Sequence, residues 1–165
     1  MNYQIINSFI NKLDPEFAHS LAIQFLKNLY IPLFQSKDDE ILKINIFGKE
    51  FLNPIGLAAG FDKNAEVYNK MFALGFGYAE VGTVTPRPQE GNLKPRVFRL
   101  IEDEAIINRL GFPSQGLEKI KSRIETKRAE GILGVNIGPN KDSTSRIDDY
   151  VECFKNFHNL CSYIC

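Results

Sequence analysis

The sequence predicts an α/β fold made of parallel β/α units and preceded by an N-terminal helical hairpin. From residue 54 onward, short apolar runs alternate with amphipathic stretches, which is the order expected of strand, helix and strand in βαβ units. Residues 3–30 instead carry apolar residues at helical spacing, interrupted by Asp14-Pro15, an N-cap followed by proline at the first helical position. We therefore expect a helical subdomain over 1–40 and β/α units over 41–165.

Composition limits the class of protein. The 165 residues are 44% hydrophobic and 24% charged, within the globular range, and 20 basic residues balance 20 acidic ones. A zero net charge gives no argument for a nucleic-acid partner. Three cysteines without a Cys-x-x-Cys pair, and two histidines, favour reduced thiols in a cytosolic compartment over a disulfide frame or a metal site.

No membrane-crossing or secretory segment is expected. The start of the chain lacks the basic region of a signal peptide, and no apolar run approaches the roughly 20 residues that a bilayer requires. The protein should be soluble or peripherally attached to a membrane.

The second N-terminal helix carries an unusually wide apolar arc. The first helix should present Ile6, Phe9, Ile10 and Leu13, and the second should present Phe17, Leu21, Phe25 and Leu29, widened by Ile23, Leu26 and Tyr30. Such an arc either packs against the rest of the protein or forms an apolar entrance for a lipid-like ligand on a membrane face.

The remaining elements follow from periodicity and turn residues. An irregular linker over 31–49 should contain a strand at 41–47, and helices should end at Gly75 and Gly131. The expected elements are strands at 55–58, 78–84, 133–137 and 162–165, helices at 65–74, 114–130 and 146–160, and an inserted hairpin at 96–100 and 105–107.

The stretch 53–63, Asn-Pro-Ile-Gly-Leu-Ala-Ala-Gly-Phe-Asp-Lys, is the first candidate site. A buried strand here ends in Ala-Ala-Gly, where a flat ligand can lie against backbone amides. Asp62 and Lys63 follow, and a lysine beside a bare backbone suits an aromatic cofactor with anionic character. The alternative is a tight turn that only requires small residues.

Two further strand ends resemble the first. The strands at 78–84 and 133–137 end in Gly82-Thr83 and Asn136-Ile137-Gly138. In a β/α barrel the carboxyl ends of all strands open on one face, so Lys63, Thr83 and Asn136 should converge on one ligand. Asn108, just after the inserted hairpin and outside any regular element, offers a donor and an acceptor to an imide or amide edge, or else serves as a turn former.

Six motifs together resemble class 2, quinone-dependent dihydroorotate dehydrogenase, of which the chain would be the N-terminal half. They run in order through essentially the whole sequence: Asp14-Pro15-Glu16-x-Ala18-His19, Asn53-Pro54-x-Gly56-Leu57-Ala58-Ala59-Gly60-x-Asp62-Lys63, Gly82-Thr83-Val84-Thr85-Pro86, Pro95-Arg96-x-Phe98-Arg99-Leu100, Asn108-Arg109-x-Gly111-Phe112 and Asn136-Ile137-Gly138.

This resemblance implies a partial TIM (β/α)8 barrel, about its first four strands, over 41–165. It implies a flavoprotein with flavin mononucleotide (FMN) that oxidises dihydroorotate to orotate in pyrimidine (UMP) biosynthesis and is reoxidised by a membrane quinone. It also implies peripheral attachment to the cytoplasmic side of the cell membrane, with residues 1–40 as the membrane and quinone-tunnel subdomain. The wide apolar arc is then functional.

The resemblance also assigns site residues. The implied flavin contacts are Ala59, Gly60, Phe61, Asp62, Lys63, Thr83 and Asn136. Lys63 would also face the substrate carboxylate and favour the reduced, anionic flavin. The implied orotate clamp is Asn108, Arg109, Leu110, Gly111 and Phe112. His19 and Arg99 resemble residues near the quinone passage.

The sequence departs from the family pattern at Pro113, where the family commonly has Asn. The family's catalytic serine, in a loop after strand four, and the phosphate-binding loops would follow Cys165. We therefore expect no catalytic base within these residues and no dehydrogenase activity from this chain alone. It would be completed by a second polypeptide, be a catalytically inactive remnant, or self-associate as a half-barrel binding module.

Overall fold

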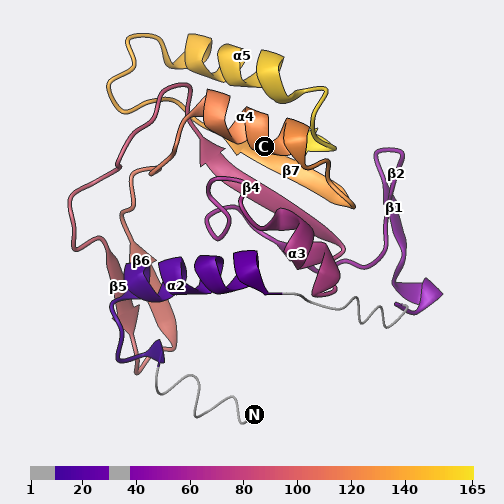
Figure 1. Ribbon diagram of the computed structural model, residues 1–165, viewed down its shortest axis with the longest axis horizontal. Coiled ribbons are helices and arrows are strands. Elements are labelled where there is room, and N and C mark those ends of the chain that lie inside the picture. The colour runs from indigo at the N-terminus through magenta and orange to yellow at the C-terminus, as the bar shows by residue number, and fades with distance from the viewer. Residues whose placement is uncertain (1–9, 30–37) are drawn as a thin grey trace.

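The computed structural model describes residues 10–29 and 38–165 of the chain. Its centre is a four-stranded, all-parallel sheet in the order β3-β4-β7-β8 (Figure 1). The strands are β3 (Gly56–Leu57), β4 (Tyr78–Val84), β7 (Ile132–Ile137) and β8 (Tyr163–Ile164). Neighbours in the sheet follow each other along the chain apart from the inserted hairpin, so the predicted parallel β/α order is confirmed.

Three helices connect these strands: α3 (Tyr68–Ala73), α4 (Leu117–Thr126) and α5 (Arg146–Phe157). In Figure 1, α4 and α5 lie side by side along the sheet. Fully buried side chains of β4 and β7, including Val81 and Leu133, meet Ile120 of α4 and Phe157 of α5 in one apolar core.

The first predicted helix of the sheet region is shorter than expected. Residues 62–67 form a turn instead of the first helical turn, because both carboxylate oxygens of Asp62 accept bonds from the backbone N–H groups of Glu66 and Val67. Ala65 in this turn has a φ of 54°, a left-handed conformation that no α-helix contains. The prediction of a helix from 65 was therefore wrong by one turn.

The helix predicted over 114–130 is α4, which is shorter at both ends. Gly116 precedes it with a φ of 85°. At the other end, side chains of α3 bind the backbone: the Tyr68 hydroxyl donates to the Lys127 carbonyl, and the Asn69 amide donates to the Arg128 carbonyl. These bonds hold 127–130 outside the helix. They are tertiary contacts, which the spacing of apolar residues in the sequence cannot predict.

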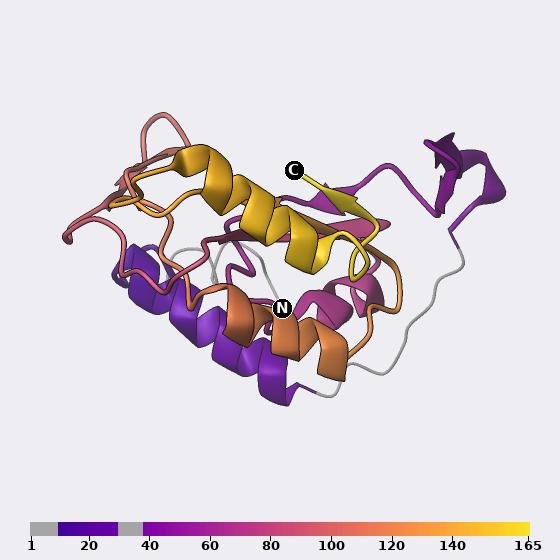
Figure 2. The same cartoon turned by 90° about the horizontal axis from the view of Figure 1, so that it is seen from above.

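Two small antiparallel hairpins flank the sheet. One pairs β1 (Ile44–Ile46) with β2 (Lys49–Phe51), so the strand predicted at 41–47 is present but shorter. Its expected first residues belong instead to the short helix η1 (Glu40–Leu42). Figure 2 shows this hairpin standing apart from the rest of the chain. The other is the predicted insertion, β5 (Val97–Leu100) with β6 (Ala105–Asn108). Asn108 closes β6, so its predicted place outside any regular element was wrong.

Helix α2 (Pro15–Asn28) begins as predicted, with the Asp14 carboxylate accepting a bond from the Phe17 N–H and Pro15 at the first position. It lies against β5 (Figure 1) and buries Ile23. Phe17, Leu21 and Phe25 are each more than half exposed, so within the described residues this part of the apolar arc does not pack on the protein. Most of the first predicted helix, including Ile6 and Phe9, falls outside the described residues, as does Tyr30 of the second. No helix within 10–29 or 38–165 has the length and hydropathy to cross a bilayer.

Burial predicts which apolar residues stabilise the fold. Ile120→Ala in α4, where the side chain is fully buried, should lower the free energy of unfolding by about 2–5 kcal/mol, because it removes apolar contacts and leaves a cavity. Ile147→Ala in α5, where the side chain is 75% exposed, is the matched control and should change it by less than about 0.5 kcal/mol. Urea denaturation of both variants measures the difference, and equal losses would contradict the described core.

Candidate functional site

The three strand ends singled out in the sequence share one cavity. The Gly60 N–H donates to the Gly82 carbonyl at 3.0 Å, and the Thr83 hydroxyl lies 2.7 Å from Asn136 Oδ1. A cavity of about 540 Å³ opens here, lined by Ala59, Gly60, Lys63, Gly82, Thr83, Asn108, Leu110, Gly111, Phe112, Pro113, Asn136, Ile137, Gly138, Tyr150 and Cys165. We call it the strand-end cavity. Gly60, Thr83 and Asn136 thus meet at one cavity as expected, and their binding of one ligand stays a prediction.

The floor of this cavity is backbone rather than side chain. Gly60 has a φ of 106°, and a Cβ built on it would meet no atom within 4 Å, so the space over its backbone is open. At Gly82, in contrast, a Cβ would lie 2.4 Å from the Asn136 carbonyl oxygen, so a side chain there would separate β4 from β7. The small residues therefore have two different roles. Gly60 leaves an open surface for a ligand, and Gly82 allows close contact between strands.

Lys63 lies between the strand-end cavity and a second cavity and lines both. It is partly buried, and burial lowers the pKa of its ammonium group, while the nearby Glu16 carboxylate opposes that shift. Its Nζ is 3.5 Å from His19 Nε2. That nitrogen is also 2.6 Å from the Phe61 carbonyl, which can only accept, so Nε2 carries a hydrogen and is not free to accept from Lys63. Among the residues that the structure describes, Lys63 has no other hydrogen-bond contact, so its N–H groups can donate to a ligand.

Two of the predicted cofactor residues, Phe61 and Asp62, do not line the strand-end cavity. Asp62 is 1% exposed and turns inward to accept bonds from the Glu66 and Val67 N–H groups in the turn before α3, and burial raises the pKa of its carboxyl. The Phe61 ring lies against the core and makes an edge-on contact with His19. Phe61 and Asp62 both turn toward the interior, whereas Lys63, the next residue, lines the cavity.

The predicted substrate clamp is largely brought together. Asn108, Leu110, Gly111 and Phe112 line the strand-end cavity. Arg109 is the exception, since its guanidinium donates to the Pro95 carbonyl and lies over the Phe98 ring at 5.9 Å, outside the cavity lining.

A second cavity of about 660 Å³ lies between α2, the β5–β6 hairpin and Lys63. We call it the helix-side cavity. His19 and Arg99 both line it, as the prediction of a shared passage requires. Arg99 donates to the Leu13 carbonyl at 2.6 Å. Burial lowers the pKa of His19, which favours the neutral imidazole. Ile23 and Val97 add apolar side chains to a lining that is otherwise largely charged and polar.

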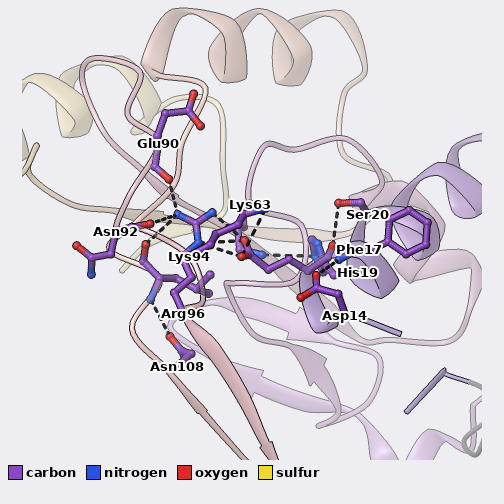
Figure 3. Close-up of polar contacts among 12 residues, drawn as sticks. Asp14, Phe17, His19, Ser20, Lys63, Glu90, Asn92, Lys94, Arg96 and Asn108 are labelled. Atoms are coloured by element: carbon purple, nitrogen blue, oxygen red, sulfur yellow. Dashed lines mark hydrogen bonds and ion pairs between the residues drawn. The ribbon is translucent and has the colours of Figure 1, made fainter. Parts of the chain in front are cut away.

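The residue pair that the sequence did not reveal is Glu16 with Arg96 (Figure 3). Arg96 Nη2 and Nε lie 2.7 Å and 3.0 Å from Glu16 Oε1, and Nη1 donates to the carbonyls of Glu90 and Asn92. The hydrogen bond and charge of Arg96 hold the pKa of the Glu16 carboxyl below its ordinary value. Both residues belong to motifs noted above, but 80 positions separate them and no local pattern indicates their contact.

No group of three or more His, Cys, Asp or Glu side chains within the described ranges is arranged to hold a metal ion. The polar groups of the strand-end cavity are instead amide, hydroxyl and ammonium groups, which bind polar edges of organic ligands.

Comparison with known proteins gives a consistent family. The family model described as dihydroorotate dehydrogenase matches residues 41–165. The dihydroorotate dehydrogenase (quinone) of Rhizobium rhizogenes is 50% identical over 151 residues, and that of Rhodopseudomonas palustris is 53% identical over 152 residues. Each match covers 92% of this chain and 42% of the relative, so the chain spans about two fifths of the length of these relatives.

Solved structures agree. The crystal structure of DHODH from Eimeria tenella in complex with ferulenol superposes with a TM-score of 0.85 at 46% identity, covering 92% of this chain and 43% of that one. A ligand-free crystal structure of the same enzyme gives 0.85 at 45% identity, covering 92% and 44%.

The Glu16–Arg96 pair predicts a pH-dependent stability. The lowered pKa of Glu16 means that its contribution is complete above the ordinary value of 4.5 and is lost as pH falls through the lowered value. At neutral pH, Glu16→Gln should lower the free energy of unfolding by about 1.5–3 kcal/mol, because Arg96 loses a charged partner. The difference from wild type should shrink in acid. Urea denaturation at neutral pH and at a pH below the lowered pKa of Glu16 measures this difference, with Glu118→Gln on α4 as the charge-matched control. A difference that stays constant between the two pH values would contradict the role given to the Glu16–Arg96 pair.

Proposed function

The chain belongs to the dihydroorotate dehydrogenase family, and from that premise we propose that it binds FMN and takes part in the quinone-dependent oxidation of dihydroorotate to orotate. The observation that carries the proposal is the convergence of Gly60, Thr83 and Asn136 on one cavity whose wall contains Lys63. The four parallel strands are proposed to be the first four of a TIM (β/α)8 barrel, in which active sites lie at the carboxyl ends of the strands.

The strand-end cavity fits a flavin. The open backbone at Gly60 accommodates a flat ring system, while Thr83 and Asn136 supply a hydroxyl and an amide for its polar edge. Lys63 supplies a positive charge that favours an anionic ligand. Ala59 extends the backbone surface. Bound there, FMN supplies the hydride acceptor that no amino-acid side chain provides.

The loop 108–112 is proposed to hold dihydroorotate. Asn108 presents both a donor and an acceptor, Leu110 and Phe112 shape an apolar wall, and Lys63 can pair with the substrate carboxylate. Arg109 is left out of this role because its guanidinium faces Pro95 and Phe98.

The helix-side cavity is proposed as the quinone site. Arg99 offers N–H groups to a quinone oxygen, His19 lines the same cavity, and Ile23 and Val97 offer apolar surface to the quinone ring. Because Lys63 lines both cavities, the two proposed sites share a wall. Electrons would therefore pass directly from the strand-end cavity to the adjoining helix-side cavity.

The exposed apolar side chains of α2 support peripheral attachment to a membrane, with residues 1–40 as the membrane-facing subdomain. Phe17, Leu21 and Phe25 project from the helix whose other side, with His19 and Ile23, lines the helix-side cavity. A quinone leaving the bilayer would then reach its site beside the same helix. The cytoplasmic face of the cell membrane is the proposed location.

FMN binding tests the proposal. Binding to the wild-type chain should quench the fluorescence of FMN. Lys63→Gln should weaken FMN binding by about tenfold or more, because a hydrogen bond to a charged group is worth about 1.5–3 kcal/mol. Lys119→Gln, an exposed lysine of α4, is the charge-matched control and should bind as wild type does.

Activity requires a second measurement, because the relatives are longer than this chain. Dihydroorotate-dependent quinone reduction is assayed with the chain alone and after adding a polypeptide that covers the remainder of a relative. Activity in either sample supports the enzymatic proposal. Wild-type chain that binds no FMN and is inactive in both would favour the alternative, a catalytically inactive remnant.

Membrane attachment predicts a selective effect on vesicle binding. The triple variant in which Phe17, Leu21 and Phe25 are each changed to Ser should cosediment with phospholipid vesicles about tenfold less or weaker still. Each apolar side chain contributes about 1.5–3 kcal/mol when it is buried in the membrane. The control replaces Ile147, Val151 and Phe154, three exposed apolar residues of α5, each with Ser. Equal losses from both triple variants would contradict a specific role for α2.

A further inference from the structure

A chain of hydrogen bonds runs behind the wall of the strand-end cavity. The Tyr163 hydroxyl donates to Glu80 Oε2 at 3.2 Å, and Asn136 Nδ2 donates to Glu80 Oε1 at 3.3 Å. Asn136 Oδ1 in turn lies 2.7 Å from the Thr83 hydroxyl. Asn136 and Thr83 line the cavity, whereas Glu80 and Tyr163 do not. The two outer residues therefore act on a ligand only through the two inner ones.

Glu80 determines the direction of every bond in this chain. A carboxylate only accepts hydrogen bonds, so the NH₂ group of Asn136 must face Glu80 and its oxygen must face Thr83. An amide oxygen also only accepts, so the Thr83 hydroxyl donates its hydrogen to Asn136. What remains for the cavity is an acceptor oxygen on Thr83 and the second N–H of Asn136.

The position of Tyr163 is set by the sheet and not by a flexible side chain. Tyr163 of β8 is in register with Gly134 of β7, and a Cβ built on Gly134 would lie 2.2 Å from the Tyr163 ring. The ring therefore lies directly against the β7 backbone, which only glycine permits. Burial, together with the neighbouring Glu80 carboxylate, raises the pKa of the Tyr163 hydroxyl, so it stays protonated and donates.

We propose that Glu80, held by Tyr163, is a positioning residue that fixes the Asn136 amide and thereby sets which atoms of the cavity wall donate and which accept toward the flavin. This rests on the proposed FMN site. A ligand edge with an N–H group beside a carbonyl matches a wall with one acceptor and one donor. Without Glu80 the Asn136 amide could present either end, and the wall would lose its fixed polarity.

Glu80→Gln is the direct test, because the amide has nearly the same shape but can both donate and accept. In ligand-free protein, the side-chain NH₂ resonances of Asn136 in ¹H–¹⁵N spectra should shift or split in Glu80→Gln. FMN binding, measured by fluorescence quenching, should weaken by about tenfold, the effect of one misdirected hydrogen bond. Tyr163→Phe, which leaves Glu80 with one fewer donor, should move both readouts in the same direction and by less.

A double variant separates polarity from structural support. In Glu80→Gln with Asn136→Asp, the carboxylate moves to position 136, and only the bond between positions 80 and 136 reverses, while Thr83 and Tyr163 still donate. Thermal stability should return toward that of wild type, but FMN affinity should not, because the wall then offers acceptors alone. Recovery of FMN affinity together with stability would overturn the proposal.

Two further results would also overturn it: Asn136 resonances unchanged in Glu80→Gln, or resonances that shift while FMN affinity stays at the wild-type value. Glu118→Gln on α4 is the charge-matched control and should alter neither readout. Wild-type protein that binds no FMN would contradict the proposed function instead, and the Asn136 resonances would still decide whether Glu80 orients the amide.

Discussion

The contact between Arg96 and Glu16 is the interaction on which the arrangement of both cavities depends. Arg96 carries its charge with only 9% of its side chain exposed, and it spends its N–H groups on the Glu16 carboxylate and on the carbonyls of Glu90 and Asn92. A buried guanidinium without such partners would be strongly destabilising. The pair therefore ties α2 to the loop that holds 108–112 in place.

The same contact explains why the two cavities meet at Lys63. Helix α2 forms one wall of the helix-side cavity, and the loop 90–92, bonded to Arg96, supports the backbone of Arg109 and Leu110 beside the strand-end cavity. Lys63 lies between the two cavities. Burial lowers the pKa of its ammonium group, and the Glu16 carboxylate acts against that shift. One ion pair thus contributes to the position of both walls and to the electrostatics of the residue they share.

Sequence patterns predicted the strands better than the helix ends. The strand at 78–84 was predicted with its observed bounds, because a run of apolar residues between turn signals is a local property. The start of α3 was missed because Asp62 binds the N–H groups of Glu66 and Val67 in the turn before it. The end of α4 was missed because Tyr68 and Asn69 of α3 bind the carbonyls of Lys127 and Arg128, just beyond its last residue. Side-chain to backbone bonds of this kind decide where a helix stops, and they depend on neighbours in space.

What the sequence by itself determined was the order of the β/α units, the small residues at three strand tips and many of the residues that line the strand-end cavity. These depend on periodicity and backbone freedom, which are encoded locally. Only the tertiary structure decided that Lys63 faces both cavities while Asp62 turns inward, that Arg109 leaves the clamp, and that Glu16 meets Arg96 across 80 positions. The physical reason is that side-chain direction and charge pairing depend on packing between segments that are far apart in the sequence. Local sequence patterns carry no information about that packing.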